Sequence, residues 1–153
     1  MNQKFESVCV IGLGYIGLPT ASLLATKGFT VVGVDVSLEV VNTINQGEIH
    51  IVEPDLDILV KSAVNSGNLT ADTQPVEADV FIIAVPTPLK DSEPDLSYIK
   101  AAVDQISAYV RPGNLIILES TSPVGTTEEI VAEGLRKQGH DTDSDILVAH
   151  CPE

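Results

Sequence analysis

Short runs of apolar, mostly β-branched residues alternate along the chain with longer segments whose apolar residues recur at helical spacing. Runs such as "DVFIIAV" and "NLIILES" are apolar without alternation, which is typical of parallel strands covered by helices on both faces. The short runs predict strands near residues 7–12, 30–35, 69–71, 79–85, 114–119 and 145–149. Helices are expected between them, so the pattern predicts repeated βαβ units.

The ends of the predicted helices carry recognisable signals. The first helix is expected over about residues 16–27, with Gly28 as a left-handed cap. After the second strand, Ser37 is a candidate N-cap and Gly47 a stop, and a second helix in the same connection ends at Gly67. The connection between strands two and three is therefore longer than a single helix.

Two further helical patterns complete the second part of the chain, over residues 95–113 and 126–139. The only cluster that reads as a loop is "PTPLKDSEPD", residues 86–95. Right-handed crossovers then favour an α/β fold of Rossmann type, a doubly wound and mainly parallel sheet of about six strands with helices on both faces. We expect residues 1–153 to form this one domain.

The composition limits the kinds of ligand and the cellular location that we expect. Eight Lys and Arg stand against 22 Asp and Glu, a formal charge of −14, so nucleic acid is not an expected ligand. No apolar stretch reaches the roughly 18 residues that span a bilayer, and "MNQKFES" lacks signal-peptide features, so we expect a cytoplasmic protein without a membrane partner. Reduced thiols are expected at Cys9 and Cys151.

The segment "VIGLGYIGLPTA" matches G-x-G-x-x-G directly after the first strand and opens the first helix. In that setting Gly12 permits a tight turn, Gly14 lets the backbone approach a pyrophosphate, and Gly17 lets the helix pack on the strand. The N–H groups of Tyr15 and Ile16 would face the anion at the positive end of the helix dipole. A tight turn with close packing alone is the other interpretation of these glycines.

Asp35 ends the second strand about 20 residues after the second glycine, the spacing of the acidic residue that accepts from the adenosine ribose. Its charge would repel the additional phosphate of NADP, so NAD is the predicted cofactor. A solvated carboxylate at a strand end is the alternative.

Two later strand ends fall on the same carboxyl edge, where open α/β sheets bind ligands. Thr87, between two prolines, offers a hydroxyl for a ribose or nicotinamide contact, although a rigid turn would explain it equally well. Thr121 leaves the fifth strand, and Thr127 begins a helix where it either binds the cofactor or caps the helix. His50 and His140 lie in no cluster with ligand spacing, so no metal site is predicted.

Taken together, "VIGLGYIGLPTA", "INQGEIHIVEPDL", "VPTP", "LESTSPVGTT" and "HCPE" resemble the N-terminal domain of the UDP-glucose/GDP-mannose dehydrogenase family. The resemblance covers essentially the whole chain. It implies that a helical dimerisation segment and a sugar-binding domain follow residue 153 and that the full-length protein is a homodimer.

The resemblance also implies a reaction, the oxidation of C6 of a nucleotide sugar to a carboxylate in two NAD-dependent steps through a cysteine-bound aldehyde-level intermediate. It places Tyr15, Ile16, Asp35, Thr87 and Thr127 at cofactor contacts, and Thr121 where a catalytic water or a substrate oxygen is positioned. Glu153 falls on the acidic residue of the hydrolytic step.

By the same resemblance, the nucleophilic cysteine and its assisting lysine lie beyond residue 153, and neither Cys9 nor Cys151 takes that role. We therefore expect this part of the enzyme to bind NAD weakly and not to turn over.

Within the family, the resemblance of the segment "GEIHIVEPDL" implies UDP-N-acetyl-D-mannosamine as the sugar, for bacterial surface polysaccharide synthesis. Oxidation of UDP-N-acetylglucosamine or UDP-glucose stays open, as does a stand-alone module that binds NAD(H).

Overall fold

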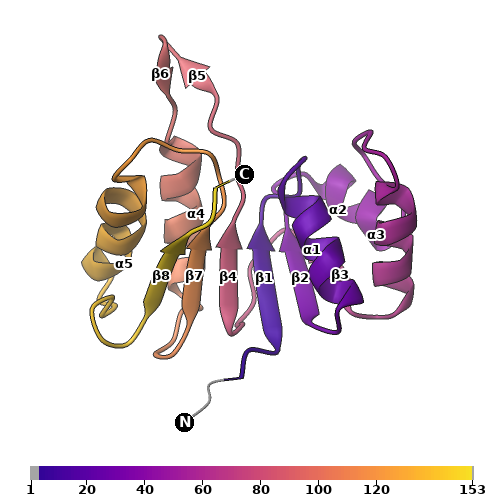
Figure 1. Cartoon of the computed structure of the whole chain (residues 1–153), viewed down its shortest axis with the longest axis horizontal. Coiled ribbons are helices and arrows are strands. Elements are labelled where there is room, and N and C mark those ends of the chain that lie inside the picture. Colours follow the sequence, from indigo (N-terminus) through magenta and orange to yellow (C-terminus); the bar gives the residue numbers. More distant parts are fainter. Residues whose placement is uncertain (1–3, 153) are drawn as a thin grey trace.

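The structure is a computed structural model and describes residues 4–152. At its centre is a six-stranded parallel sheet with the strand order β3-β2-β1-β4-β7-β8 (Figure 1). The strands are β1 (Ser7–Ile11), β2 (Thr30–Val34), β3 (Leu69–Asp72), β4 (Val80–Ile83), β7 (Leu115–Leu118) and β8 (Leu147–His150). This order is that of a Rossmann fold, so the predicted fold class and the six predicted strands are confirmed.

Helices cover both faces of the sheet. The helices α1 (Gly17–Thr26), α2 (Leu38–Asn45) and α3 (Leu56–Asn65) lie on one face, and α4 (Ser97–Ser107) and α5 (Glu133–Lys137) lie on the other (Figure 1). Residues of β1 alternate between the two cores, because Val8 and Val10 pack with the first group of helices while Cys9 and Ile11 pack with the second.

The local signals hold at most helix ends. Ser37 caps α2 by accepting a hydrogen bond from the N–H of Val40, and Gly28 follows α1 with a φ of 98°. The helix that follows β7 begins differently from its prediction, because residues Thr127–Ala132 form a π-helix that continues into α5.

The segment 86–95 is more than a loop. It contains a short antiparallel pair, β5 (Leu89–Lys90) and β6 (Glu93–Pro94), which projects above the sheet (Figure 1). In the turn between them, Asp91 and Ser92 have positive φ. Glycine usually occupies such positions, and neither residue is glycine, so the sequence did not predict this turn.

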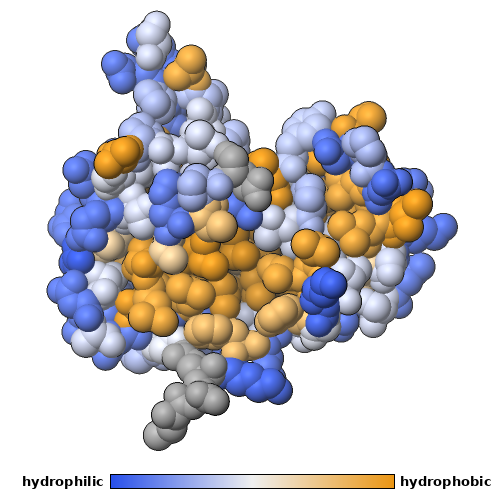
Figure 2. All heavy atoms as spheres, viewed as in Figure 1, coloured by the Kyte–Doolittle hydropathy of each residue, from blue (hydrophilic) through white to orange (hydrophobic). Residues whose placement is uncertain are grey.

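The two faces of the sheet are covered unequally. The helices α1, α2 and α3 lie over β1, β2 and β3, and beside them the same face of β4, β7 and β8 shows a broad apolar surface (Figure 2). In register, this surface carries Val80, Leu115 and Leu147 in one row and Ile82 and Ile117 in the next. Leu147 is 55% exposed, so this half of the sheet is open on one side.

At the edge of the sheet where the strands begin, Asp79 joins the two halves of the sheet by connecting the starts of β1 and β4. Its Oδ2 accepts hydrogen bonds from the N–H groups of Glu6 and Ser7 at 2.8 and 2.9 Å and from the Ser7 hydroxyl at 3.0 Å. These donors, led by the Glu6 N–H, hold the pKa of the Asp79 carboxyl below its ordinary value.

Among the helices of residues 4–152, none is long and apolar enough to cross a membrane.

Candidate cofactor-binding site

The candidate site lies at the carboxyl edge of the sheet, where the strand order reverses between β1 and β4. Three segments meet there: the glycine loop after β1, the "VPTP" loop after β4, and the segment that begins at Glu119 after β7. Each predicted site residue within the described chain falls on one of these segments, on the end of β2, or on the helix that follows β7.

Two glycines of the loop are required by the protein's own packing. Gly12 has a φ of 97°, and a Cβ there would lie 2.5 Å from the carbonyl oxygen of Ala84. A Cβ on Gly17 would lie 1.8 Å from the carbonyl oxygen of Gly12. The tight turn and the close helix packing predicted for these positions are therefore present.

Gly14 is different, because a Cβ built on it meets no atom within 4 Å. Nothing in the fold requires a glycine there, yet a side chain would fill the space above the start of α1. Tyr15 and Ile16 lie beside it with exposed fractions of 61% and 37%, and α1 begins at the next residue. Backbone N–H groups at such a helix start have no partner within the helix and are suited to an anion.

Asp35 follows β2 with its carboxylate held in place by the backbone. Oδ2 accepts from the N–H of Leu13 in the glycine loop at 3.2 Å, and Oδ1 accepts from the N–H of Ser37 at 3.0 Å. The carboxylate is thus oriented against the glycine loop before any ligand binds.

Beside Asp35 lies an apolar slot of about 220 Å³ that the sequence did not reveal. The end of β2, the loop after β4 and one side of α4 form its walls. Its lining includes Asp35, Val36, Val85, Pro86, Tyr98, Ala101 and Gln105. In the sequence, Tyr98 and Gln105 are marked only by their positions next to Ile99 and Ile106, which form the buried side of α4. The fold is needed to show that Tyr98 and Gln105 lie close to the end of β2.

Direct hydrogen bonds connect the loops after β4 and β7. The Thr87 hydroxyl donates to the carbonyl oxygen of Thr121 at 2.7 Å, and the Ser120 hydroxyl donates to that of Val85 at 2.8 Å. Thr121 itself is exposed, which leaves it accessible at the edge of the sheet. The structure therefore brings Thr87 and Thr121 into one local unit.

Thr127 and Glu153 are the remaining predicted site residues. Thr127 is the first residue of the π-helix, and Thr126 occupies the N-cap position, so the alternative that Thr127 caps this helix is wrong. The Thr126 hydroxyl donates to the Pro123 carbonyl oxygen at 2.8 Å and makes no cap bond. Glu153 lies outside the described residues.

The two cysteines are free thiols in contrasting surroundings. Cys9 is buried within β1, and this burial raises the pKa of its thiol to about 11, which disfavours the reactive thiolate. Cys151 is exposed just after β8.

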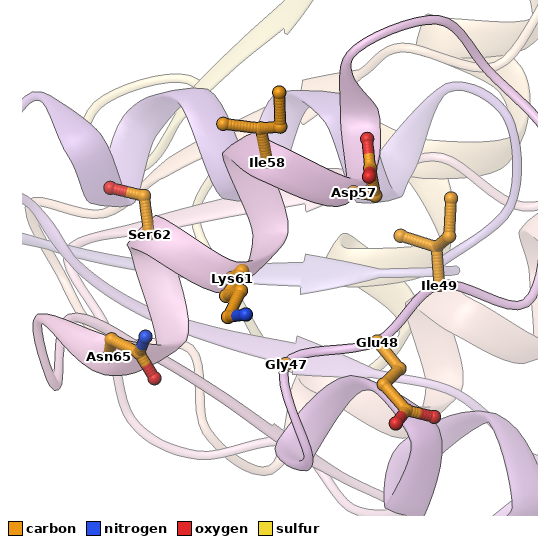
Figure 3. Close-up of a pocket in the computed structure, with 8 residues that line it drawn as sticks. All are labelled: Gly47, Glu48, Ile49, Asp57, Ile58, Lys61, Ser62 and Asn65. Atoms are coloured by element: carbon orange, nitrogen blue, oxygen red, sulfur yellow. The ribbon is translucent and has the colours of Figure 1, made fainter.

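A larger hollow of about 650 Å³ lies between the loop after α2 and one face of α3 (Figure 3). It is lined by Gly47, Glu48, Ile49, Asp57, Ile58, Lys61, Ser62 and Asn65, none of which lines the slot beside Asp35. It is open and of mixed charge, and no predicted site residue reaches it, so we assign the site to the carboxyl edge.

The site combines a glycine loop that opens α1, an acidic residue at the end of β2 and an apolar slot, which together fit a dinucleotide. Residues 6–153 match the model of the NAD-binding domain of the UDP-glucose/GDP-mannose dehydrogenase family. The chain belongs to this family. NAD is accordingly its cofactor, as the sequence predicted.

Curated members of the family are similar over the whole chain. A UDP-N-acetyl-D-mannosamine dehydrogenase from Campylobacter jejuni is 55% identical over 100% of this chain and 40% of its own length. An NDP-N-acetyl-D-galactosaminuronic acid dehydrogenase from Ralstonia nicotianae is 54% identical over 100% of this chain and 38% of its own. The chain therefore spans about two-fifths of the length of these relatives.

Solved structures of the family agree. The UDP-N-acetyl-mannosamine dehydrogenase from Staphylococcus aureus superposes with a TM-score of 0.91 at 39% identity, over 96% of this chain and 36% of that one. A GDP-mannose dehydrogenase from Pseudomonas aeruginosa gives a TM-score of 0.90 at 32% identity, over 95% of this chain and 36% of that one.

Proposed function

We propose that this chain is the NAD-binding part of a dehydrogenase that oxidises C6 of UDP-N-acetyl-D-mannosamine to the carboxylate. The observation that carries the proposal is the 55% identity, over the entire chain, to a UDP-N-acetyl-D-mannosamine dehydrogenase. The residues at the carboxyl edge supply what such an enzyme needs from its first domain.

In this proposal the backbone around Gly14, with the N–H groups of Tyr15 and Ile16, holds the pyrophosphate of NAD. Asp35 would accept from the adenosine ribose hydroxyls, and the apolar slot lined by Tyr98 would hold the adenine. Thr87 and Thr127 contact the cofactor further along the same edge. When bound, NAD accepts one hydride in each of the two oxidation steps.

Asp35 also explains the choice of NAD over NADP, because its carboxylate would repel a 2′-phosphate. Replacing Asp35 with Ala removes charge-assisted hydrogen bonds, so NAD affinity measured by calorimetry should fall at least several-fold. Unchanged affinity would remove Asp35 from the site.

The overall conversion turns one CH₂OH group into a carboxylate. Two hydrides leave to two NAD molecules, water supplies the second oxygen, and the protons are released. Thr121 positions the attacking water or the substrate oxygen, and Glu153 assists the hydrolytic step. The nucleophilic cysteine and its lysine belong to polypeptide that follows residue 153, so residues 1–153 alone do not turn over.

A second candidate substrate is an NDP-N-acetyl-D-galactosamine sugar, because the Ralstonia relative is 54% identical. The difference between 55% and 54% sequence identity is too small to separate the two sugars. In this proposal, the contacts to the sugar belong largely to the rest of the enzyme.

The deciding experiment measures NADH formed per sugar by the chain extended through its natural C-terminus. UDP-N-acetylmannosamine, UDP-N-acetylgalactosamine, UDP-N-acetylglucosamine and UDP-glucose are offered separately. Two NADH per UDP-N-acetylmannosamine, with little from the others, is the expected result. Activity on another sugar would overturn the substrate and keep the reaction, whereas none at all would favour a stand-alone NAD-binding module.

A further inference from the structure

A buried acidic side chain, Glu119, lies at the carboxyl edge and has not been used by the proposed mechanism. It directly follows β7, two residues before Thr121, and only 7% of it is exposed. Burying a carboxylate is costly unless hydrogen bonds compensate it, so the partners of Glu119 indicate what its side chain does in the fold.

The contact of Glu119 crosses from one half of the sheet to the other. Its Oε1 accepts a hydrogen bond of 2.9 Å from the hydroxyl of Thr20, which lies in the first turn of α1. Thr20 is three residues after Gly17, on the helix whose start faces the pyrophosphate position. The bond thus connects the pyrophosphate-binding helix to the end of β7.

The same strand end is also fixed against β4. The N–H of Glu119 donates to the carbonyl oxygen of Ile83 at 2.8 Å, and the hydroxyls of Ser120 and Thr87 complete the connection described above. The chain of contacts therefore runs from Thr20 through Glu119 to Thr121, and from Thr121 to Thr87.

This arrangement has a direction relative to the dinucleotide. The adenosine end is assigned to the slot between β2 and α4, and the pyrophosphate to the start of α1. The nicotinamide end then extends across the switch point toward the ends of β4 and β7. A shift of β7 relative to α1 would alter the nicotinamide contacts while leaving those of the adenosine half in place.

We propose that Glu119 is a positioning residue: by accepting the Thr20 hydrogen bond, it fixes the segment carrying Thr121 at the offset from α1 that the nicotinamide half of NAD requires. The inference rests on the proposed function, because it concerns the same cofactor.

The test compares two ligands on this chain, NAD and ADP-ribose, which lacks the nicotinamide ring. Thr20→Val removes the donor with little change of shape, and calorimetry gives both dissociation constants. We expect NAD binding to weaken about tenfold, as for the loss of one hydrogen bond to a charged group, and ADP-ribose binding to change less than about twofold. Thr20→Ser should restore NAD affinity.

Two further variants serve as controls. Thr26→Val makes the same chemical change on α1 at an exposed residue whose hydroxyl donates only to the Leu23 carbonyl oxygen, and it should leave both affinities unchanged. Glu119→Gln keeps an oxygen acceptor for Thr20, so the ratio of the two affinities should stay near that of the unchanged chain. If Thr20→Val does not fold, as judged by circular dichroism, Thr20→Ala replaces it.

Each other outcome overturns the proposal. Equal weakening of both ligands would mean that the bond merely supports α1, and no weakening would mean that it positions nothing. A loss in Glu119→Gln equal to that in Thr20→Val would assign the effect to the charge. If the chain extended through its natural C-terminus binds neither ligand, the proposed cofactor site is wrong. Binding of both ligands by Thr20→Val at an unchanged ratio would instead overturn only the role of Glu119.

Discussion

The two halves of the sheet contribute to the candidate site by different means. In the half formed by β1, β2 and β3, the glycine backbone and the Asp35 carboxylate make the site, with Gly12 and Gly17 packed so closely that no side chain fits. In the half formed by β4, β7 and β8, hydroxyls and a carboxylate make it, through hydrogen bonds between loops. Backbone sites are marked by glycine and are readable from a sequence, whereas side-chain sites depend on which loops meet.

The halves also differ in packing. The first is covered by helices on one face and shares its other core with the second, while the second leaves Leu115, Ile117 and Leu147 partly or largely exposed. Substitutions of buried residues in the first half should therefore lower the free energy of unfolding on either face of the sheet. In the second half, the loss should be larger on the covered face than on the open face.

The largest effect is expected in the backbone half, from Gly17→Ala. Its Cβ would overlap the carbonyl oxygen of Gly12 at 1.8 Å, so α1 or the loop must move. We expect a loss of more than about 4 kcal/mol in the free energy of unfolding, measured by denaturant titration. Stability within about 1 kcal/mol of the unchanged chain would contradict this packing.

Gly14→Val is the matched change at the glycine that the fold does not require. Because its Cβ lies in open space, the unfolding midpoint should stay nearly unchanged. NAD binding should disappear, since the side chain occupies the pyrophosphate position. A variant that is stable and still binds NAD normally would show that the ligand approaches elsewhere.

Neighbouring residues of β7 test the unequal faces of the second half. Ile116 is fully buried against the core with α4 and α5, and Ile116→Ala should cost about 2–5 kcal/mol of unfolding free energy. Ile117 faces the open side, where Ile117→Ala should cost about 1 kcal/mol, because less contact is lost. Equal losses would mean that the open face is covered.

Asp79→Asn probes the joint between the two halves and should depend on pH. The pKa of Asp79 is lowered by its hydrogen bonds, so its stabilising contribution is fully present above the ordinary carboxyl pKa near 3.9. It is lost as the pH falls through the lowered pKa of the folded state. Thermal melts should therefore separate the variant from the unchanged chain by about 1 kcal/mol at pH 7 and converge in strong acid.

The smallest expected effect is a difference in thiol reactivity. Cys151 is exposed, whereas Cys9 is buried with its pKa raised to about 11. An aromatic disulfide reagent at pH 8 should modify one thiol per folded chain rapidly and the second only after denaturation. Rapid modification of both would indicate that β1 opens readily.

Much of this molecule was predictable, and the exceptions have physical reasons. The six strands followed from apolar runs that tertiary packing did not override, and Ser37 and Gly28 marked their helix ends chemically. The turn at Asp91 and Ser92 was missed because it adopts positive φ without glycine. The π-helix was missed because its hydrogen-bond pattern leaves no distinct residue signature.

The candidate site divided in the same way. Gly12, Gly14, Gly17 and Asp35 have a fixed spacing along one βαβ unit, so the sequence alone identifies them. Tyr98 of the slot and the bond between Thr20 and Glu119 join residues distant in sequence, and only the strand order brings them together. The sequence therefore identifies site residues that lie within one βαβ unit, but it does not identify their contacts with residues elsewhere on the sheet.

The open face of β4, β7 and β8 has a further consequence for how copies of this chain behave toward one another in solution. The chain carries a formal charge of −14, so molecules that present this apolar face also repel each other electrostatically. At 10 mM salt that repulsion reaches about 30 Å, and at 1 M salt only about 3 Å. Colloidal behaviour is therefore governed by ionic strength: adding salt should draw the sheet faces together before it changes the fold.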